Sequence, residues 1–136
     1  MNEIILASSS KYRQELLRRL TINFISISPN IDEEKFDNEN FEDLARRLSN
    51  EKAQVISKKY PSAFVIGSDQ TAEYKNKEVR KPLNKEKAFL QLKELSGQTL
   101  NFFSGVCLKN YQRNISIDEV VKFSVTYKKF SDKQIK

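Results

Sequence analysis

At 136 residues, the chain has the length of one domain, long enough for its own hydrophobic core but too short for two. Hydrophobic residues make up 38% of it and charged residues 31%, and no apolar run approaches the roughly 18 residues of a membrane span, so we expect one soluble domain. The sequence has no histidine and one cysteine, Cys107, which excludes histidine-based triads, disulfides and cysteine or histidine zinc clusters. Any chemistry must use carboxylates, lysines, arginines and hydroxyls.

The net charge of +6 indicates an anionic partner, but the basic residues are scattered along the chain rather than gathered in a stripe. We therefore favour a compositional origin of the charge over a nucleic-acid surface. The first seven residues lack the basic start and long apolar stretch of a secretory signal. Together with the lone cysteine, this favours a cytoplasmic protein without a membrane or nucleic-acid partner.

Apolar spacing alternates between strand-like and helix-like patterns, which favours an α/β fold. The patterns predict strands at residues 4–7, 23–28 and 63–67, and helices at about 11–20 and 41–60, the second capped by Asn40. A hairpin is expected next, with arms at 69–74 and 79–80 around a turn at 75–78, followed by a helix from Asn84 to Gly97. Two long runs, 99–108 and 115–127, predict an antiparallel pair of strands.

The last predicted element begins with a capping box, the pattern Ser131-Asp132-Lys133-Gln134, which opens helices. Only two residues follow this pattern, far short of the 12 or so that even a marginal helix needs. We therefore expect a single domain over residues 1–136 whose C-terminal part is missing. A frayed tail is the alternative.

Three serines, Ser8-Ser9-Ser10, lie between the first strand and the first helix. Free backbone N–H groups and the helix dipole favour a phosphate at such a position. On the helix that follows, Arg13 falls near the middle of the apolar stripe formed by three leucines between residues 16 and 20. An arginine there requires an anion, unless it extends over the helix end to reach water.

The long helix has a similar irregularity, because Lys52 lies on the same face as Phe41 and the other apolar residues of that helix. A lysine in an apolar stripe must be paired, solvated through a cleft, or neutral. A structural ion pair explains the pattern as well as a ligand does. The neighbouring Arg46 and Arg47 point away from the stripe and are predicted to be solvated.

A third candidate is Gly67-Ser68-Asp69-Gln70, which follows a buried strand at the edge where open α/β sheets bind ligands. If this strand and the first are parallel neighbours, Asp69 and Arg13 share that edge with the serines, and the turn Asp32-Glu33 is a source of a second carboxylate. Two carboxylates and several cations suit a metal-bound phosphate. The alternatives are a turn cap for Asp69 and a solvated acidic loop. Lys81, before Pro82, is a further cation.

Several short segments resemble, in order and spacing, those of the Maf nucleotide pyrophosphatases. They are Ile4–Ser10 with Arg13, Asp32-Glu33, Arg47-Leu48, Glu51-Lys52-Ala53, Gly67–Gln70, Lys81-Pro82-Leu83 and Leu95-Ser96-Gly97. The resemblance covers nearly the whole chain. It implies an elongated Maf-like fold, related to that of the ITPases, with a mixed central sheet flanked by helices, and it implies a homodimer. A further C-terminal motif of the family, Gly-Ser-Phe-Lys followed by Glu-Gly, is absent, and Gln14 stands where many relatives have a basic residue.

The resemblance also implies a reaction, the cleavage of a nucleoside triphosphate between its α and β phosphates with a divalent cation, Mg²⁺ or Mn²⁺. In this family pattern Ser8, Arg13, Lys52 and Lys81 would hold the triphosphate, and Glu33 and Asp69 would serve the metal and the attacking water. Asp69 would be the proton acceptor. Arg13 and Lys52 are the residues that the helical patterns single out independently.

Within the family, Ser68-Asp69-Gln70 and Tyr12 resemble the branch that hydrolyses 7-methyl-GTP. The branch acting on dTTP and UTP usually has Asp-Thr at the corresponding step, and it is the alternative. A methylated guanine is positively charged, which favours stacking on Tyr12, and Gln70 is expected to bind the base edge. The other hypotheses are a non-catalytic remnant that binds nucleotides or a protein partner, and a basic nucleic-acid-binding domain.

Overall fold

The computed structural model describes residues 3–20, 22–75, 77–79 and 84–129, and it shows an α/β protein built on one mixed sheet. Its elements are β1 (Ile4–Ala7), α1 (Lys11–Arg18), β2 (Ile25–Ser26), α2 (Phe41–Lys59), β3 (Phe64–Tyr74), β4 (Lys77–Glu78), α3 (Lys85–Leu95), β5 (Thr99–Asn110) and β6 (Ile115–Thr126). The sheet has six strands in the order β2-β1-β3-β5-β6, with β4 paired to β3. The predicted fold class is confirmed.

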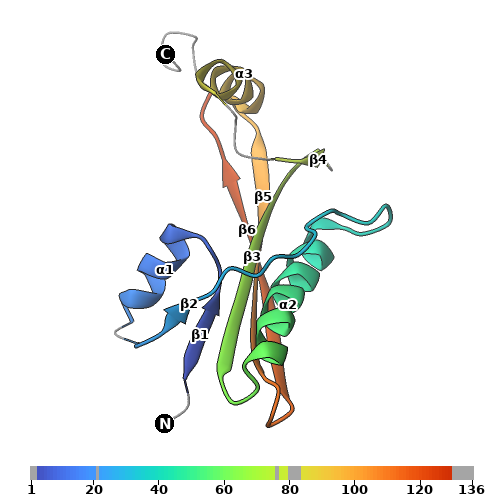
Figure 1. Cartoon of the computed structure of the whole chain (residues 1–136). Coiled ribbons are helices and arrows are strands. Elements are labelled where there is room, and N and C mark those ends of the chain that lie inside the picture. Colours follow the sequence, from blue (N-terminus) through green and yellow to red (C-terminus); the bar gives the residue numbers. More distant parts are fainter. Residues whose placement is uncertain (1–2, 21, 76, 80–83, 130–136) are drawn as a thin grey trace.

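The sheet changes from parallel to antiparallel at β3. β1 runs parallel to β2 and β3, whereas β5 pairs antiparallel with both β3 and β6. β1 ends at Ala7, opposite Gly67, but β3 continues to Tyr74 beside β5. Because the antiparallel strands extend beyond the parallel ones, the molecule is elongated, with α3 at the far end (Figure 1).

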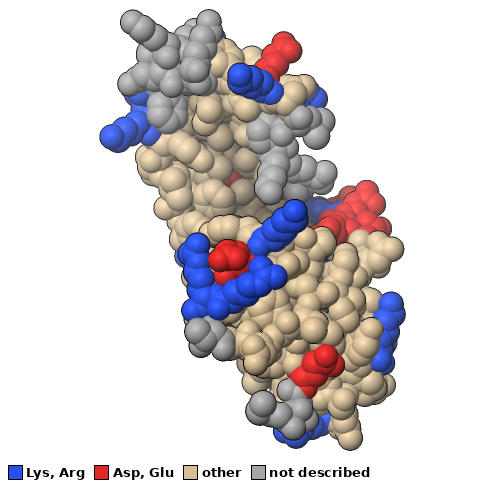
Figure 2. Space-filling view, turned by 60° about the vertical axis from the view of Figure 1, so that its left-hand side comes forward, with Lys and Arg blue, Asp and Glu red and all other residues tan. Residues whose placement is uncertain are grey.

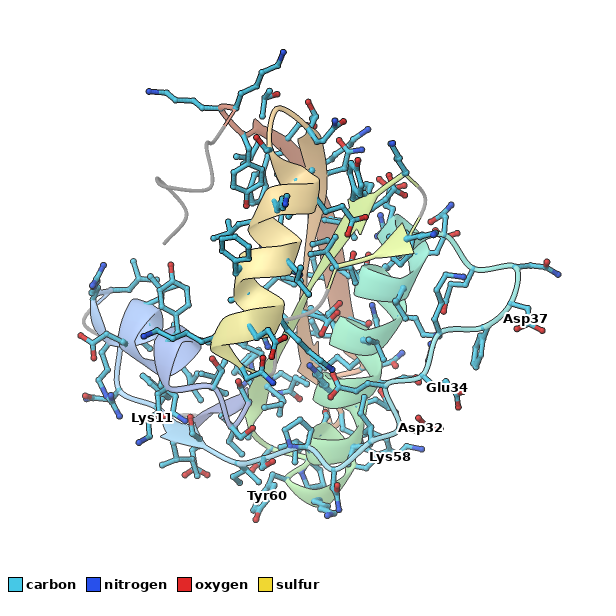
Figure 3. All side chains as sticks on the ribbon, turned by 90° about the horizontal axis from the view of Figure 1, so that it is seen from above. Lys11, Asp32, Glu34, Asp37, Lys58 and Tyr60 are labelled. Carbon is cyan, nitrogen blue, oxygen red and sulfur yellow. The ribbon has the colours of Figure 1, made fainter. Side chains whose placement is uncertain are left out.

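Helices α1 and α2 lie on opposite sides of this sheet (Figures 1 and 3). α2 begins at its predicted cap, Asn40, whose side chain accepts a hydrogen bond from the backbone N–H of Asp43. α2 approaches the sheet closely because glycine faces it: a Cβ added at Gly67 would lie 2.2 Å from the carbonyl oxygen of Ser49. Gly105 of β5 meets the backbone of Ala45 in the same way.

The core lies between α2 and the sheet. One group of buried side chains joins β1, α2, β3 and β5, and consists of Ile5, Ala7, Ala53, Ile56, Ala63, Val65 and Cys107. A second group joins the first half of α2 to β5, and consists of Phe41, Leu44, Ala45, Leu48 and Phe103. Burial of a large apolar side chain contributes about 1.5–3 kcal/mol, so apolar packing holds α2 firmly to the sheet.

Alternation along β3 directs its side chains to two different faces. Asp69 and Thr71 point toward α2, where Asp69 contacts Lys52 and the Thr71 hydroxyl donates to the carbonyl of Phe41. Ser68 and Gln70 alternate with them and point to the side on which α1 lies. We call these two sides the α2 face and the α1 face of the sheet.

α1 differs most from expectation. It covers Lys11–Arg18 rather than 11–20, and none of its residues is buried. Leu16 and Leu20, two of the three leucines in the predicted stripe, are 41% and 63% exposed. The amphipathic pattern is present, but its apolar side is not packed into the core.

Some predicted strand boundaries need correction. The predicted strand at 63–67 and the hairpin arm at 69–74 are one strand, β3, because β5 pairs with it continuously from Val65 to Glu73. The strand predicted at 23–28 is reduced to β2, because only Ile25 and Ser26 pair with β1. The hairpin turn is shorter than expected because Lys77 and Glu78 already pair with β3.

The other predicted elements are confirmed within a few residues. Asn84 caps α3, and β5 and β6 form the expected antiparallel pair. The capping box at 131–134 lies outside the described residues. Within the described ranges, no helix combines the length and apolar character needed to cross a membrane.

Candidate active site

The chain turns where β1 ends, and serine hydroxyls gather in this turn. Ser8 is buried, and its Oγ accepts a hydrogen bond from the Ser10 backbone N–H at 3.0 Å. The Oγ of Ser10 caps α1 by accepting from the backbone N–H of Arg13 at 3.3 Å. Because each oxygen accepts from the backbone, its own O–H proton remains free to donate to an anion at the start of α1.

Arg13 joins α1 to β3. Its Nη1 donates to the carbonyl oxygen of Ser68 at 3.1 Å, one residue beyond the last pair between β1 and β3. The parallel pairing of these strands therefore brings the serine turn, Arg13 and the segment Ser68-Asp69 to one edge, as predicted. Arg13 binds a carbonyl here, and its side chain is turned toward the sheet rather than extended into water.

Lys52 is the charged residue on the apolar face of α2, and only 8% of it is exposed. Its Nζ lies 3.0 Å from Oδ1 of Asp69 on β3 and 3.0 Å from Oε1 of Glu33 in the loop before α2. Of the three alternatives for such a lysine, pairing is the one observed. Two carboxylates from separate segments are thus held around one ammonium group on the α2 face.

Burial also changes the basicity of Asp69, which is 8% exposed. Desolvation raises the pKa of its carboxyl above the ordinary value, against the opposing effects of Lys52 and Arg13. A carboxylate whose pKa is raised accepts a proton more readily than an exposed one does. The geometry therefore suits Asp69 to activate a water molecule.

Arg47 fastens the loop that carries Glu33 to α2. Its guanidinium donates to both oxygens of Glu39 at 2.7 and 3.0 Å, to Glu51 at 2.9 Å, and to the backbone carbonyl of Glu34 at 2.8 Å. The prediction that Arg47 is solvated is therefore wrong. Helical spacing shows on which side of α2 an arginine lies, but not that a loop packs against that side.

The Arg46 side chain is 45% exposed, which agrees with its predicted solvation, but it also has a partner. It forms an ion pair with Asp118 of β6, which also accepts a hydrogen bond from Asn50. This pair ties the middle of α2 to the edge strand. Both arginines stabilise contacts of α2 with other segments of the fold, and neither belongs to the cluster around Lys52.

Glu39→Gln tests whether Arg47 holds the loop, because the stability that this ion pair contributes depends on pH. The hydrogen bond from Arg47 lowers the pKa of Glu39, so the pair stabilises the fold fully above the ordinary glutamate pKa and is lost as pH falls through the lowered value. We expect the thermal midpoint of the variant to lie roughly 4 °C below that of the wild type at neutral pH, and this gap to close in acid. Thermal unfolding of both proteins over a pH series measures this difference in midpoint. A gap that does not change with pH would contradict the assignment.

Two open cavities meet at Asp69 and Gln70, which line both. The first, of about 620 Å³, is lined by the acidic loop 32–34 and by Leu44 and Leu48 of α2. Figure 3 shows Asp32 and Glu34 along this loop beside α2, whereas Lys11 marks the start of α1 across the sheet. The second cavity, of about 570 Å³, is a groove on the α1 face that includes Ser10, Tyr12 and Arg13.

The structure thus gathers most residues that the sequence singles out. Those around the end of β1 and the middle of β3 are Ser8, Arg13, Glu33, Lys52 and Asp69. Tyr12 and Gln70 are exposed side chains of the groove. Lys81 lies outside the described residues, so its predicted place at the site stays a prediction.

The chain belongs to the Maf family, because the family model described as "Maf-like protein" matches residues 3–136. It is 40% identical to the 7-methyl-GTP pyrophosphatase of Pseudoalteromonas translucida, over 97% of this chain and 65% of that protein. It is 42% identical to the 7-methyl-GTP pyrophosphatase of Pseudomonas aeruginosa, over 100% of this chain and 71% of that one. A nucleoside triphosphate pyrophosphatase of Acinetobacter baylyi is 39% identical, over 99% of this chain and 70% of that protein. The chain therefore spans 65% to 71% of the length of these relatives.

A solved structure supports the fold assignment. The Staphylococcus aureus Ham1 protein superposes with a TM-score of 0.55 over 92% of this chain and 70% of that chain, at 17% sequence identity. At this identity the likeness concerns the fold alone, and it agrees with the mixed sheet described above.

Proposed function

We propose that this chain hydrolyses 7-methyl-GTP to the nucleoside monophosphate and pyrophosphate. The observation that supports this most directly is the cluster of buried Asp69 and Lys52 with exposed Glu33, which lies beside Arg13 and the serine turn. The carboxylates supply a base for water, and the cations and hydroxyls suit a phosphate chain. The names of the relatives from Pseudoalteromonas and Pseudomonas support this substrate.

In the proposed reaction Asp69 accepts a proton from a water molecule, whose oxygen attacks the α-phosphorus. The bond from this phosphorus to the oxygen bridging to the β phosphate breaks, and pyrophosphate leaves with the electron pair. Ser8 and Arg13 bind the phosphates from the start of α1, together with Lys81. Lys52 holds Asp69 and Glu33 in position and contributes positive charge near the reacting group.

Glu33 and Asp69 fit a divalent cation such as Mg²⁺ or Mn²⁺. One oxygen of each carboxylate lies 3.0 Å from the same Nζ atom of Lys52. Mg²⁺ commonly takes one or two carboxylates and completes its shell with water and substrate phosphate, so two carboxylates suffice. Among the described residues, no three metal-ligating side chains form a group. When bound, the ion would neutralise charge on the phosphates.

We assign the groove on the α1 face to the base. Tyr12 is 72% exposed there, so its ring is free to stack on a cationic base, and Gln70 points into the same groove from β3. The general name of the Acinetobacter relative leaves a dTTP or UTP pyrophosphatase as the second candidate.

The test is pyrophosphate release by the 136-residue chain from 7-methyl-GTP, GTP, dTTP and UTP, with Mg²⁺ or Mn²⁺. We expect kcat/KM for 7-methyl-GTP to exceed the others by roughly tenfold or more. Preference for dTTP or UTP would select the second candidate. Nucleotide binding without turnover by a chain shown to be folded by circular dichroism would select the non-catalytic remnant.

The surface charge does not favour nucleic acid as the partner. On the face shown in Figure 2, basic side chains lie beside acidic ones and are separated by uncharged surface, without a continuous basic stripe. A cytoplasmic location is proposed from the single, buried cysteine. The homodimer that the family resemblance implies stays a prediction.

A further inference from the structure

Glu119 of β6 is an acidic residue in an otherwise apolar row on the α1 face. Val120 packs against the core on the α2 face, so its neighbours in sequence point the other way. The row on the α1 face consists of Ile115, Ile117, Glu119, Val121, Phe123 and Val125. Among the described residues Glu119 forms no ion pair, whereas Asp118, on the opposite face, pairs with Arg46.

The strand register places Glu119 on the floor of the groove that includes Tyr12 and Gln70. Glu119 lies opposite Val106 of β5, and Val106 lies opposite Ser68 of β3. With two strand spacings between them, the backbones at Glu119 and Ser68 are roughly 10 Å apart. The adjacent row across the same strands consists of Val121, Ser104 and Gln70. Both rows line the groove of about 570 Å³, and Tyr12, Arg13 and Leu16 line its α1 side.

We propose that Glu119 recognises the positively charged, N7-methylated guanine of the substrate, an inference that rests on the proposed function. The ring N1–H and the exocyclic amine of guanine are adjacent donors, and one carboxylate can accept from both. Methylation at N7 adds a positive charge to this base, which strengthens the attraction to a carboxylate. Uracil and thymine lack this adjacent pair of donors.

The surroundings of Glu119 strengthen this attraction. Val106 and Val121 beside it are apolar, and a base lying on them would exclude water, which lowers the local dielectric and increases the effect of charge. Tyr12 would contact the face of the base and Gln70 another part of its edge. Glu119 would thus add a charge-dependent contact to two contacts that any flat, polar base can form.

The test measures binding of two nucleosides without phosphates, 7-methylguanosine and guanosine, by equilibrium dialysis. Glu119→Gln keeps the shape of the side chain but removes its charge. We expect it to weaken binding of 7-methylguanosine by about tenfold and binding of guanosine by about twofold or less. Glu119→Lys, which reverses the charge, is expected to abolish the preference for the methylated nucleoside. Glu94→Gln, on the exposed side of α3, removes the same charge away from the groove and is expected to bind both nucleosides as the wild type does.

Two results would overturn the inference. One is a folded Glu119→Gln variant that discriminates between the nucleosides as the wild type does, and the other is a wild type that binds both equally. The release of pyrophosphate separates this failure from that of the proposed function. If the wild type cleaves 7-methyl-GTP and Glu119→Gln keeps the same preference over GTP, only the role of Glu119 is wrong. If the folded wild type cleaves no triphosphate, the proposed function itself fails.

Discussion

Asp69→Asn is expected to lower pyrophosphate release from 7-methyl-GTP by at least about a hundredfold, the effect of removing a general base. The amide is nearly the same size as the carboxylate and keeps an oxygen for the Nζ of Lys52, which lies 3.0 Å from Oδ1 in the native chain. Burial disfavours the charge of Asp69, which offsets part of the loss of its ion pair, and the Nζ of Lys52 keeps Glu33 as a charged partner. We therefore expect thermal unfolding near the wild-type temperature, and the two measurements together separate chemistry from folding.

Asp118→Asn is the matched control for this experiment. Asp118 also contacts a cation, Arg46, but this pair joins α2 to β6 and lies outside the cluster around Lys52. We expect this variant to lose some stability and to retain pyrophosphate release within about twofold of the wild type. If Asp69→Asn kept more than a tenth of the wild-type rate, the role of Asp69 as the proton acceptor would have to be abandoned.

Gly67→Ala is expected to give the largest loss of stability. The added Cβ would lie 2.2 Å from the carbonyl oxygen of Ser49 and 2.8 Å from the backbone nitrogen of Ala53. Both atoms belong to the backbone of α2, so the clash cannot be relieved by a change of rotamer, and the helix must move away from β3. Overpacking of this kind costs about 1–3 kcal/mol or more, which lowers the thermal midpoint by roughly 10 °C. Thermal unfolding followed by circular dichroism measures the shift.

Activity should fall in the same variant, because α2 carries Lys52 and β3 carries Asp69. Gly97→Asn provides the control, since it also adds a side chain to a glycine. Gly97 has a φ of 73°, which asparagine tolerates better than most residues, and the nearest neighbour of its added Cβ is the flexible side chain of Lys129. We expect the thermal midpoint of Gly97→Asn to fall by only a few degrees. Equal shifts in both variants would show that the close approach of α2 to Gly67 is not what limits stability.

Lys52 illustrates how far the sequence supports a prediction of the site. Its position on the apolar face of a long helix follows from helical periodicity alone, and a buried lysine needs a partner. The parallel pairing of β1 and β3 was a condition of the argument that Asp69 and Arg13 share an edge, and the structure meets it. The elements that hold these residues have strong periodic patterns and clear caps, such as Asn40, and were predictable for that reason.

Residues whose role depends on how separate segments meet were not predictable. The periodicity of α1 resembles that of a packed helix, yet whether an element covers an apolar side is a property of the tertiary structure. The ion pairs of Arg47 arise because an irregular loop folds back on α2, and no local pattern encodes that path. Glu119 could have been noticed as the acidic residue within an alternating apolar strand, but its place in the same groove as Tyr12 depends on the register of three strands.

The exposure of α1 affects the energetics of ligand binding. Because this helix buries no side chain, opening it locally requires less free energy than opening α2, although α1 contributes Tyr12 and Arg13 to the site. An anion bound at the serine turn would shift this local equilibrium toward the helical form. Any affinity measured for a nucleotide therefore contains the free energy needed to order α1, and a substitution that favours this helix would tighten binding without touching the ligand.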